Sequence, residues 1–330
     1  MSHAIRIHEL GGPDVLRWEA VTVADPAPGE VLVRHTAVGL NYIDVYFRTG
    51  LYPGPELPFT PGMEAAGVVE AAGDGVTDLA PGDRVAYASA PLGSYAERRC
   101  MPADRVVPLP HGVDDRKAAA MMLKGMTARY LLKSTHPVQP GETILFHAAA
   151  GGVGLIACQW AKHLGARVLG TVGSREKAEL ARRHGCDHPI VYTEEDFVER
   201  VRELTADQGV PVVYDSVGQA TFMRSLDCLA PRGHMVSFGQ SSGAVDPLNI
   251  GILSQKGSLT LTRPTLGHYT ATRADLLATA GDLFEVVAAG HVDIEIGQTF
   301  PLREAARAHA ALEGRETTGS TILLPEAGAS

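Results

Sequence analysis

A glycine-rich turn between an apolar strand and an apolar helix limits what this chain can fold into more than any other feature. The segment HAAAGGVG at 147–154 follows the strand-like TILF and opens the helix-like LIACQWAKHL. Small residues allow a backbone to approach a pyrophosphate, and a helix N-terminus offers unpaired N–H groups and a positive dipole end. A glycine string alone also fits a flexible turn. The order strand, turn, helix nevertheless predicts that Gly151, Gly152, Val153 and Gly154 bind a dinucleotide.

Strand-like and helix-like segments alternate beyond this turn. Short apolar runs such as ARVLGTV, HPIVY and VPVVYDS are separated by helical patterns. Strands that are apolar on both faces and alternate with helices are typical of a doubly wound parallel sheet. Ser174 and Thr193 stand where helix N-caps are expected, and Gly165 and Gly185 stand where helices are expected to end. The sequence therefore predicts an α/β fold with a Rossmann-type domain over residues 125–264.

The two ends of the chain have a different character. Near the N-terminus, apolar runs such as VLVRHTAVGL and DRVAYAS are separated by the turn formers PGE, PGM and PGDR, as in a β-rich domain. After residue 265 we expect an amphipathic helix, a strand, another helix and a final strand, STILLP. A segment this short makes a weak domain by itself, so we expect it to join the N-terminal part. The expected second domain therefore combines residues 1–124 and 265–330.

The end of the second strand after the turn indicates which dinucleotide binds. An NAD site usually has an Asp or Glu about 20 residues past the glycines, where it binds the ribose 2′-hydroxyl. Residues 171–177 here read TVGSREK, with no acid at the strand end. Ser174 can donate to a 2′-phosphate, and Arg175 or Lys177 can neutralise it. Tyr192 can reach the same phosphate. Both residues also have purely structural explanations: Lys177 as a solvated lysine on a helix, and Tyr192 as a half-buried tyrosine at a strand end. The pattern as a whole nevertheless favours NADPH over NADH.

Composition and charge argue against several classes of protein. The chain has 330 residues, of which 45% are hydrophobic and 20% charged, so global disorder is excluded. Its net charge of −9 argues against a dedicated nucleic-acid binder and against adhesion to an anionic membrane. The cysteines Cys100, Cys158, Cys186 and Cys228 lack zinc-knuckle spacing and fit thiols of a reducing compartment. Because the first residues lack the apolar core of a signal peptide, we expect a soluble, cytoplasmic protein.

Several separated motifs occur in the order found in one known superfamily. They are NYIDVYFRTGLYP at 41–53, PGMEAAG at 61–67, PGDRVAY at 81–87, AAGGVG at 149–154, VVYDSVG at 212–218 and VSFGQSSG at 236–243. The chain thereby resembles the medium-chain dehydrogenases/reductases, and among them the zinc-independent, zeta-crystallin-like NADPH:quinone oxidoreductases. This resemblance covers essentially the whole chain. It implies a Rossmann NADPH-binding domain, a GroES-like β-rich catalytic domain, and transfer of a hydride or single electrons to a quinone.

The chain departs from the zinc-dependent alcohol dehydrogenases of the same superfamily at the metal-binding positions. Those enzymes carry a cysteine ligand in the early block and a histidine ligand in a Gly-His-Glu stretch. The corresponding segments here read Gly-Leu-Asn41 and Gly-Met63-Glu64. Methionine is a poor ligand for Zn²⁺, and one carboxylate cannot hold the ion alone. We therefore expect no metal.

The resemblance also implies which residues form the site. Those expected at the cofactor are Asn41, Tyr46, Thr127, Gly151, Gly152, Val153, Gly154, Gly173, Ser174, Lys177, Tyr192, Ser216, Phe238, Gly239, Ser241, Arg263 and Arg315. A quinone that accepts hydride develops negative charge on its oxygen and needs a hydrogen-bond donor there. The expected catalytic residues are the donors Asn41, Tyr46 and Arg263, with Tyr52 as an aromatic wall or second donor. Two of these residues have structural alternatives to a cofactor contact: Phe238 can be an aromatic residue of the core, and Arg315 can be a cation that is favoured at a helix end.

Two other functions remain open at this point. The same scaffold can reduce another activated alkene, such as a 2-alkenal or an enone, because both reactions deliver hydride to a conjugated carbonyl. The chain can also act mainly by binding NADPH, as crystallin and RNA-contacting members of the family suggest, although its negative charge disfavours RNA. We expect a homodimer that pairs through the edge strand SLTLTRP at 258–264.

Overall fold

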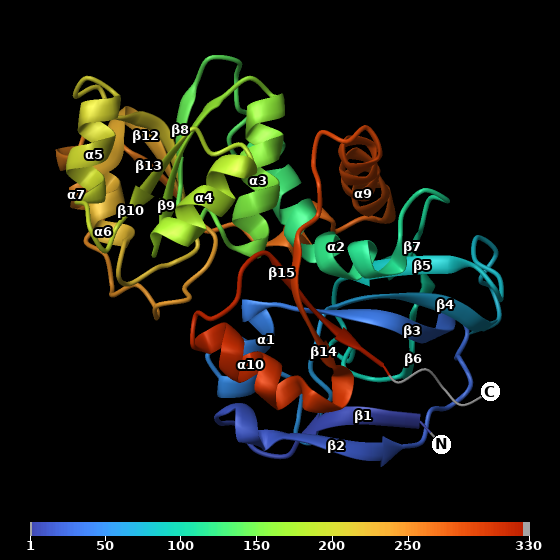
Figure 1. The fold of residues 1–330 in the computed structure, drawn as a ribbon. Coiled ribbons are helices and arrows are strands. Elements are labelled where there is room, and N and C mark those ends of the chain that lie inside the picture. Colours follow the sequence, from blue (N-terminus) through green and yellow to red (C-terminus); the bar gives the residue numbers. More distant parts are fainter. Residues whose placement is uncertain (1, 326–330) are drawn as a thin grey trace. The chain divides into compact units, whose positions relative to one another are not determined.

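The structure is a computed structural model that describes residues 2–325, and this part of the chain forms two compact units. The central unit comprises residues 125–269 and 289–293. The N-terminal unit comprises residues up to 124, together with 270–288 and the chain from 294 onward. Each unit has its own sheet and its own apolar core, and Figure 1 shows the elements of each.

The central unit is built on a parallel sheet. Within the described chain its strands, in spatial order, are β10 (His188–Val191), β9 (Arg167–Val172), β8 (Thr143–Phe146), β11 (Val210–Asp215), β12 (Leu229–Ser237) and β13 (Thr260–Thr262). Every neighbouring pair is parallel. The strand order reverses between β8 and β11, and ligands of such sheets bind where the order reverses, at the carboxyl ends of the strands. The expected doubly wound sheet is confirmed.

Helices connect these strands or follow the last of them. They are α3 (Gly152–His163), α4 (Arg175–Arg183), α5 (Phe197–Leu204), α6 (Phe222–Ser225), α7 (Gly251–Gln255) and α8 (Leu266–Tyr269). The expected cap at Ser174 is present, because its side chain accepts a hydrogen bond from the Lys177 amide. Thr193 is not an N-cap: α5 begins later, and Asp196 caps it by accepting from the amides of Val198 and Glu199. An acid three residues further on satisfies two helix donors, which the threonine is too distant to reach.

The strands of the central unit carry apolar side chains on both faces of the sheet, and helices cover both faces. Leu145, Leu169, Val213 and Met235 are fully buried, and they pack with the apolar faces of α5 and α6 in one core. The chain adds strands from β8 outward to β10 and then from β11 outward to β13, so right-handed crossovers place the helices of the two directions on opposite faces of the sheet. Gly165 and Gly185 both have a φ of 87°, the left-handed conformation that ends α3 and α4 as expected.

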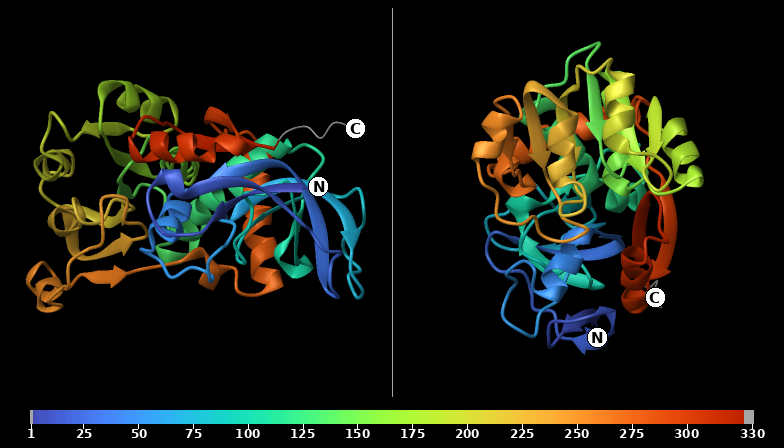
Figure 2. Two further views of the ribbon diagram at one scale, coloured as in Figure 1. Left: turned by 90° about the horizontal axis from the view of Figure 1, so that it is seen from below. Right: turned by 90° about the vertical axis from the view of Figure 1, so that its left-hand side faces the viewer.

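The N-terminal unit consists mainly of antiparallel strands. A two-stranded ribbon, β1 (Ser2–Ile7) with β2 (Leu16–Val21), lies apart from a larger sheet, as the deep blue strands of Figure 2 show. The larger sheet contains β14 (Ile296–Pro301), β15 (Ser320–Leu324), β3 (Glu30–Leu40), β4 (Glu64–Ala72), β5 (Arg84–Ala88), β7 (Val107–Pro108) and β6 (Arg98–Pro102). The C-terminal strand β15 pairs with β3, so the end of the chain does return to the N-terminal part.

Helices cover parts of this second sheet. They are α1 (Tyr42–Thr49), α9 (Arg273–Ala288) and α10 (Ala305–Glu313), and α2 (Asp115–Tyr130) begins in the N-terminal unit. Figure 1 shows α10 beside α1, and hydrogen bonds between their side chains agree with this. The core between the strands and α10 contains Val33, Leu40 and Tyr95, all buried. No helix in the described chain has the length and apolar character that crossing a membrane requires.

Candidate active site

The glycine turn of the central unit leaves a helix N-terminus without a side-chain cap. Helix α3 follows the extended residue Gly151, and within the described chain no side chain caps it. A Cβ on Gly154 would lie 2.3 Å from the carbonyl oxygen of Ala148, so only glycine lets α3 pack this close to the turn. The amides of the first helical turn and the dipole of α3 therefore suit an anion such as a pyrophosphate.

A cluster of buried polar side chains lies next to the glycine turn. His147, the residue before the turn, contacts Thr171 Oγ1 at 2.8 Å through Nδ1 and Ser225 Oγ at 2.9 Å through Nε2. The single hydroxyl proton of Ser225 is donated to Asp215 or to a backbone carbonyl, so Nε2–H of His147 is the donor to Ser225. Burial lowers the pKa of His147, while the charge of Asp215 acts to raise it. The cluster ties the carboxyl ends of β8, β9 and β11 together.

Sequence reasoning did not identify this cluster. The signal for it was weak: a histidine directly after a buried strand and an aspartate at the end of another. Asp215 also accepts hydrogen bonds from the amides of Val217 and Gly218 and from the hydroxyl of Thr221. It thereby shapes the loop that follows β11 through contacts within six residues, whereas its contact with Ser225 links that loop to the His147 cluster.

The residues expected around a 2′-phosphate lie at the ends of β9 and β10. Ser174 follows Gly173 and begins α4, with Lys177 one turn into that helix. Tyr192 follows β10, and its hydroxyl lies so near Gly173 that a Cβ there would be 2.8 Å away. A hydroxyl, an ammonium and a phenol thus surround the start of α4, and with the uncapped α3 they fit a phosphorylated dinucleotide.

Arg175 is placed differently. Its guanidinium contacts the carboxylate of Glu194 at 2.8 and 3.0 Å, and 83% of its side chain is exposed. Of the two cations proposed for the phosphate, Lys177 is therefore the less exposed, and Arg175 already has an acidic partner.

The loop after β12 lies against the loop after β11. The amides of Phe238 and Gly239 donate to the carbonyl of Asp215, and the amide of Ser241 donates to that of Ser216 at 3.1 Å. Four residues expected at the cofactor (Ser216, Phe238, Gly239 and Ser241) are thus brought together at the carboxyl ends of β11 and β12, next to the switch point of the sheet. Phe238 also packs against Phe146, with ring centroids 5.6 Å apart, so the core role considered for it is present as well.

Two further expected residues of the central unit have clear positions. Arg263 directly follows β13 and donates to the carbonyl of Ser237 at 2.8 Å, which joins the ends of two adjacent strands. Thr127 is buried in the second half of α2. The roles of these residues toward a cofactor stay predictions.

Asn41 lies in a buried polar pocket of the N-terminal unit. It is the N-cap of α1, and its backbone amide donates to Asp44 Oδ2 at 2.9 Å. Its side-chain amide donates from Nδ2 to Glu64 Oε2 at 2.7 Å. The second carboxylate oxygen of Glu64 accepts from the amide of Leu123, also at 2.7 Å. Asn41 therefore has the partners that a buried amide needs.

Lys124 completes this pocket and was missed by sequence reasoning. Its ammonium contacts Glu64 Oε2 at 3.2 Å, and its side chain is 7% exposed. The available signal was a single lysine in the apolar stretch AAAMMLKGMTA of α2. A buried lysine in such a stretch needs an acidic partner. The sequence around Lys124 does not show which acid this is, because Glu64 lies sixty positions away.

Aromatic rings line α1 next to Asn41. Tyr46 is buried, and its ring centroid lies 5.0 Å from that of Tyr52 and 6.3 Å from that of Tyr42. The amide of Tyr52 donates to the Tyr46 carbonyl at 3.0 Å. Asn41, Tyr46 and Tyr52 belong to the N-terminal unit and Arg263 to the central unit, and their catalytic roles stay predictions. Arg315 is exposed after the end of α10.

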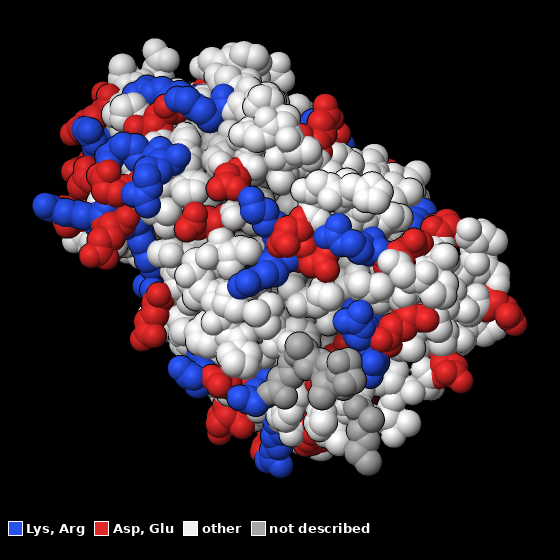
Figure 3. All heavy atoms as spheres, turned by 45° about the vertical axis from the view of Figure 1, so that its right-hand side comes forward, with Lys and Arg blue, Asp and Glu red and all other residues white. Residues whose placement is uncertain are grey.

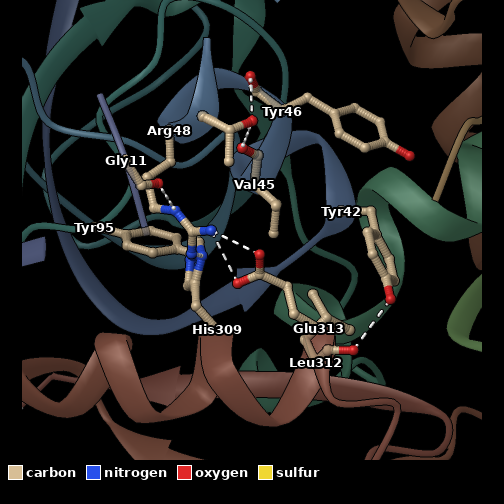
Figure 4. A network of polar contacts seen from close by, with 10 residues as sticks. Gly11, Tyr42, Val45, Tyr46, Arg48, Tyr95, His309, Leu312 and Glu313 are labelled. Atoms are coloured by element: carbon tan, nitrogen blue, oxygen red, sulfur yellow. Dashed lines mark hydrogen bonds and ion pairs between the residues drawn. The ribbon is translucent and has the colours of Figure 1, made fainter. Parts of the chain in front are cut away.

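A second buried network holds the far end of α1 against α10 (Figure 4). The fully buried Arg48 donates to His309, to the carbonyl of Gly11 and, through two hydrogen bonds, to Glu313. His309 contacts the hydroxyl of Tyr95, which donates to Asp44 at 3.1 Å. Burial lowers the pKa of His309 to about 3 and raises that of Asp44 to about 7. This network connects the pocket of Asn41 to α10.

Within residues 2–325, no three His, Cys, Asp or Glu side chains lie together as a metal site would require. At the positions where the alcohol dehydrogenases carry ligands, Asn41 donates to a carboxylate rather than offering a thiolate. Glu64, the remaining carboxylate, has three protein donors around it.

Comparison with known proteins covers both units. The profile described as an alcohol dehydrogenase GroES-like domain matches residues 27–111, and the one described as a zinc-binding dehydrogenase matches residues 152–282. A quinone oxidoreductase of Pseudomonas aeruginosa is 56% identical over 98% of this chain and 100% of its own length. A 2-haloacrylate reductase of a Burkholderia species is 49% identical over 99% of this chain and 100% of its own.

A solved structure gives the same result. The crystal structure of Escherichia coli quinone oxidoreductase complexed with NADPH is 51% identical, with a TM-score of 0.97 over 98% of this chain and 100% of that one. The expected combination of a Rossmann-type domain with a GroES-like domain is therefore confirmed. With whole-length identity above one half and both domain profiles matched, this chain belongs to the quinone oxidoreductase family of the medium-chain dehydrogenase/reductase superfamily.

Proposed function

We propose that this protein is an enzyme that uses NADPH to reduce quinones. The observation that carries the proposal is the whole-length similarity to quinone oxidoreductases, one of which has been solved with NADPH. The uncapped start of α3 and the hydroxyl and ammonium groups at the start of α4 support it, because they suit a pyrophosphate and a 2′-phosphate.

The nicotinamide cofactor, when bound, supplies the hydride, and the chain supplies position and electrostatics. We assign the pyrophosphate to Gly151, Gly152, Val153 and Gly154, and the 2′-phosphate to Gly173, Ser174, Lys177 and Tyr192. The remaining contacts to the cofactor are assigned to Asn41, Tyr46, Thr127, Ser216, Phe238, Gly239, Ser241, Arg263 and Arg315. Each group binds or orients the dinucleotide, and those that are also proposed as donors to the substrate are described next.

The N-terminal unit provides the hydrogen bonds that the reaction requires. Negative charge collects on the carbonyl oxygen of the quinone as it is reduced, and donors that are already oriented stabilise it. We assign this role to the amide of Asn41 and the hydroxyl of Tyr46, with Arg263 as a further donor. Tyr52 packs on Tyr46 and provides an aromatic surface for a planar substrate.

The proposal includes several broader properties. We propose that residues 1–124 and 265–330 form the catalytic domain and residues 125–264 the NADPH-binding domain, that no zinc takes part, and that the enzyme acts in the cytoplasm. We further propose a homodimer, supported by the position of β13 at an edge of its sheet. Sedimentation of a monomer at micromolar concentration would argue against the dimer.

An alternative substrate class is an activated alkene such as a 2-alkenal or an enone. The similarity to a 2-haloacrylate reductase favours this alternative, since that relative covers the whole chain at 49% identity. Both reactions place negative charge on an oxygen conjugated to the reduced carbon, so the donors proposed above would serve either substrate.

A mainly binding role is less well supported. On the face drawn in Figure 3, Lys and Arg side chains lie among Asp and Glu side chains. Three arginines of α4 and α5 form ion pairs with acids, namely Arg175–Glu194, Arg182–Glu179 and Arg200–Glu203. Such mixed charge does not favour a polyanion such as RNA. Filter binding to RNA at two salt concentrations tests this role.

The experiment that tests the proposed function follows NADPH absorbance with purified protein. NADPH and NADH are compared with a benzoquinone and, separately, with a 2-alkenal, each with and without a chelator. We expect rapid NADPH consumption with quinone that the chelator does not change. Faster turnover of the alkenal would favour the alternative substrate class, and a preference for NADH would contradict the assignment of Ser174 and Lys177.

A further inference from the structure

Glu64 is held by donors on three sides in the pocket of Asn41. Its Oε2 accepts from Asn41 Nδ2 at 2.7 Å and from Lys124 Nζ at 3.2 Å, while its Oε1 accepts from the amide of Leu123 at 2.7 Å. The Glu64 side chain is fully buried and that of Lys124 is 7% exposed. An ionised carboxylate only accepts hydrogen bonds. The group of Asn41 that faces it must therefore be the NH2, so Glu64, together with the capping box in which the Asn41 side chain accepts from the Asp44 backbone, determines which way the amide points.

The backbone makes room for this carboxylate. A Cβ on Gly39, in β3, would lie 2.2 Å from Glu64 Oε2 and 2.3 Å from the carbonyl oxygen of Ala119 in α2. Only a glycine lets the strand, the carboxylate and the helix approach this closely. Gly39 pairs with Glu64 across the sheet, so the register of β3 and β4 places this gap where the carboxylate lies.

Lys124 also balances the negative charge of Glu64. A buried carboxylate directly bonded to Asn41 would repel negative charge that develops on a substrate oxygen near that amide. The ammonium of Lys124 on the same carboxylate oxygen offsets this charge. The Glu64–Lys124 pair therefore orients the Asn41 amide and at the same time leaves its surroundings without an uncompensated anion.

We propose that Glu64 and Lys124 are positioning residues for the reduction, acting together through Asn41. The inference rests on the proposed function, because it requires the substrate oxygen to lie at Asn41. It applies equally to a quinone and to an activated alkene, since both develop negative charge on oxygen.

The test compares wild-type protein with Lys124→Met, Glu64→Gln and the double variant. Lys124→Met leaves the carboxylate uncompensated, and we expect kcat to fall by about tenfold or more. Glu64→Gln presents an amide that can turn an N–H toward Asn41, so kcat falls as well. Adding Glu64→Gln to Lys124→Met removes the repelling charge and should raise kcat relative to Lys124→Met, although not to the wild-type value.

The expected signature is a reversal of sign in the effect on kcat. Glu64→Gln slows the wild-type protein but speeds the Lys124→Met variant. Removing one partner of a buried ion pair can also unfold a protein, whereas removing both charges is often tolerated. Rates are therefore normalised to the concentration of NADPH-binding sites, measured by fluorescence titration. The Kd for NADPH should change little in any variant. Lys117→Met, an exposed lysine two turns earlier on α2, is the matched control and should keep the wild-type rate.

Two outcomes would overturn the inference. In the first, wild-type protein turns over and Lys124→Met retains its kcat per binding site. In the second, the double variant is slower than both single variants, which would mean independent losses rather than joint action. Wild-type protein that binds NADPH but reduces neither quinone nor alkenal would instead overturn the proposed function, and the inference with it.

Discussion

The guanidinium of Arg48 contacts Nδ1 of His309 at 3.0 Å, and both side chains are fully buried. Arginine has only donors, so Nδ1 of His309 must be the acceptor and its proton must be on Nε2. That proton points to the hydroxyl of Tyr95, which in turn donates to Asp44. The hydrogen bonds therefore run in one direction, from His309 of α10 through Tyr95 to Asp44 near the start of α1, and Figure 4 shows the part with Arg48, His309 and Tyr95.

Arg48→Met should destabilise the protein without changing the proposed NADPH site. The substitution leaves the ring of His309, the carbonyl of Gly11 and the carboxylate of Glu313 without their donor. We expect the free energy of unfolding, measured in urea, to fall by about 3 kcal/mol. Arg307→Met on α10 is the control, because that arginine is 72% exposed. Its effect should stay below about 0.5 kcal/mol, and equal losses in the two variants would contradict the prediction.

Asp44→Asn should change how stability depends on pH. Burial raises the pKa of Asp44 to about 7, so the folded protein holds a proton that the unfolded chain releases between about pH 4 and 7. This group therefore makes stability fall as pH rises through that window. Asparagine removes the effect, and we expect the variant to gain roughly 2 kcal/mol relative to wild type between pH 5 and 8.

Urea unfolding of both proteins at several pH values measures this gain. The low pKa of His309, about 3, acts in the opposite sense, but it is present in both proteins and largely cancels in the difference. Parallel stability curves for the two proteins would show that Asp44 is ionised in the folded protein across this range.

Gly154→Ala should weaken NADPH binding. The added methyl would lie 2.3 Å from the carbonyl oxygen of Ala148 and 2.7 Å from the carbonyl carbon of Ala149, both backbone atoms. Helix α3 would have to move from the turn, and we expect the Kd for NADPH to rise by about tenfold or more. Gly281→Ala, in α9, is the control because nothing lies within 4 Å of the added methyl. The control should leave the Kd unchanged and can stabilise its helix.

The double substitution Ser174→Ala and Lys177→Ala should reduce the preference for NADPH. Each side chain is proposed to bind the 2′-phosphate, which NADH lacks, so kcat/KM should fall by about 100-fold with NADPH and little with NADH. Loss of the Ser174 cap on α4 affects both cofactors alike and does not change their ratio. Arg175→Ala should keep the preference, because Glu194 already binds that guanidinium. A larger effect from Arg175→Ala would assign the phosphate to Arg175 instead.

Short-range patterns were sufficient to predict much of the central unit. The turn before α3 and the cap at Ser174 depend on neighbouring residues, so they could be read directly from the chain. The predicted start of α5 was wrong because Thr193 and Asp196 are both good caps. In the structure a turn follows β10, with the amides of Glu194 and Glu195 donating to the Val191 carbonyl, and α5 begins after it at Asp196. The role of Phe238 was left open because a strand aromatic can serve the core and a ligand loop together.

The fold class could be predicted from the sequence because periodicity and turn residues are properties of short segments, and the family could be predicted because the motifs that carry the resemblance are short segments as well. The tertiary structure alone decided that Lys124 pairs with Glu64, sixty positions away, and Arg48 with His309, 261 positions away. A buried charge requires a partner, but which residue provides it depends on strand register and helix packing, and these are settled only when the distant segments meet.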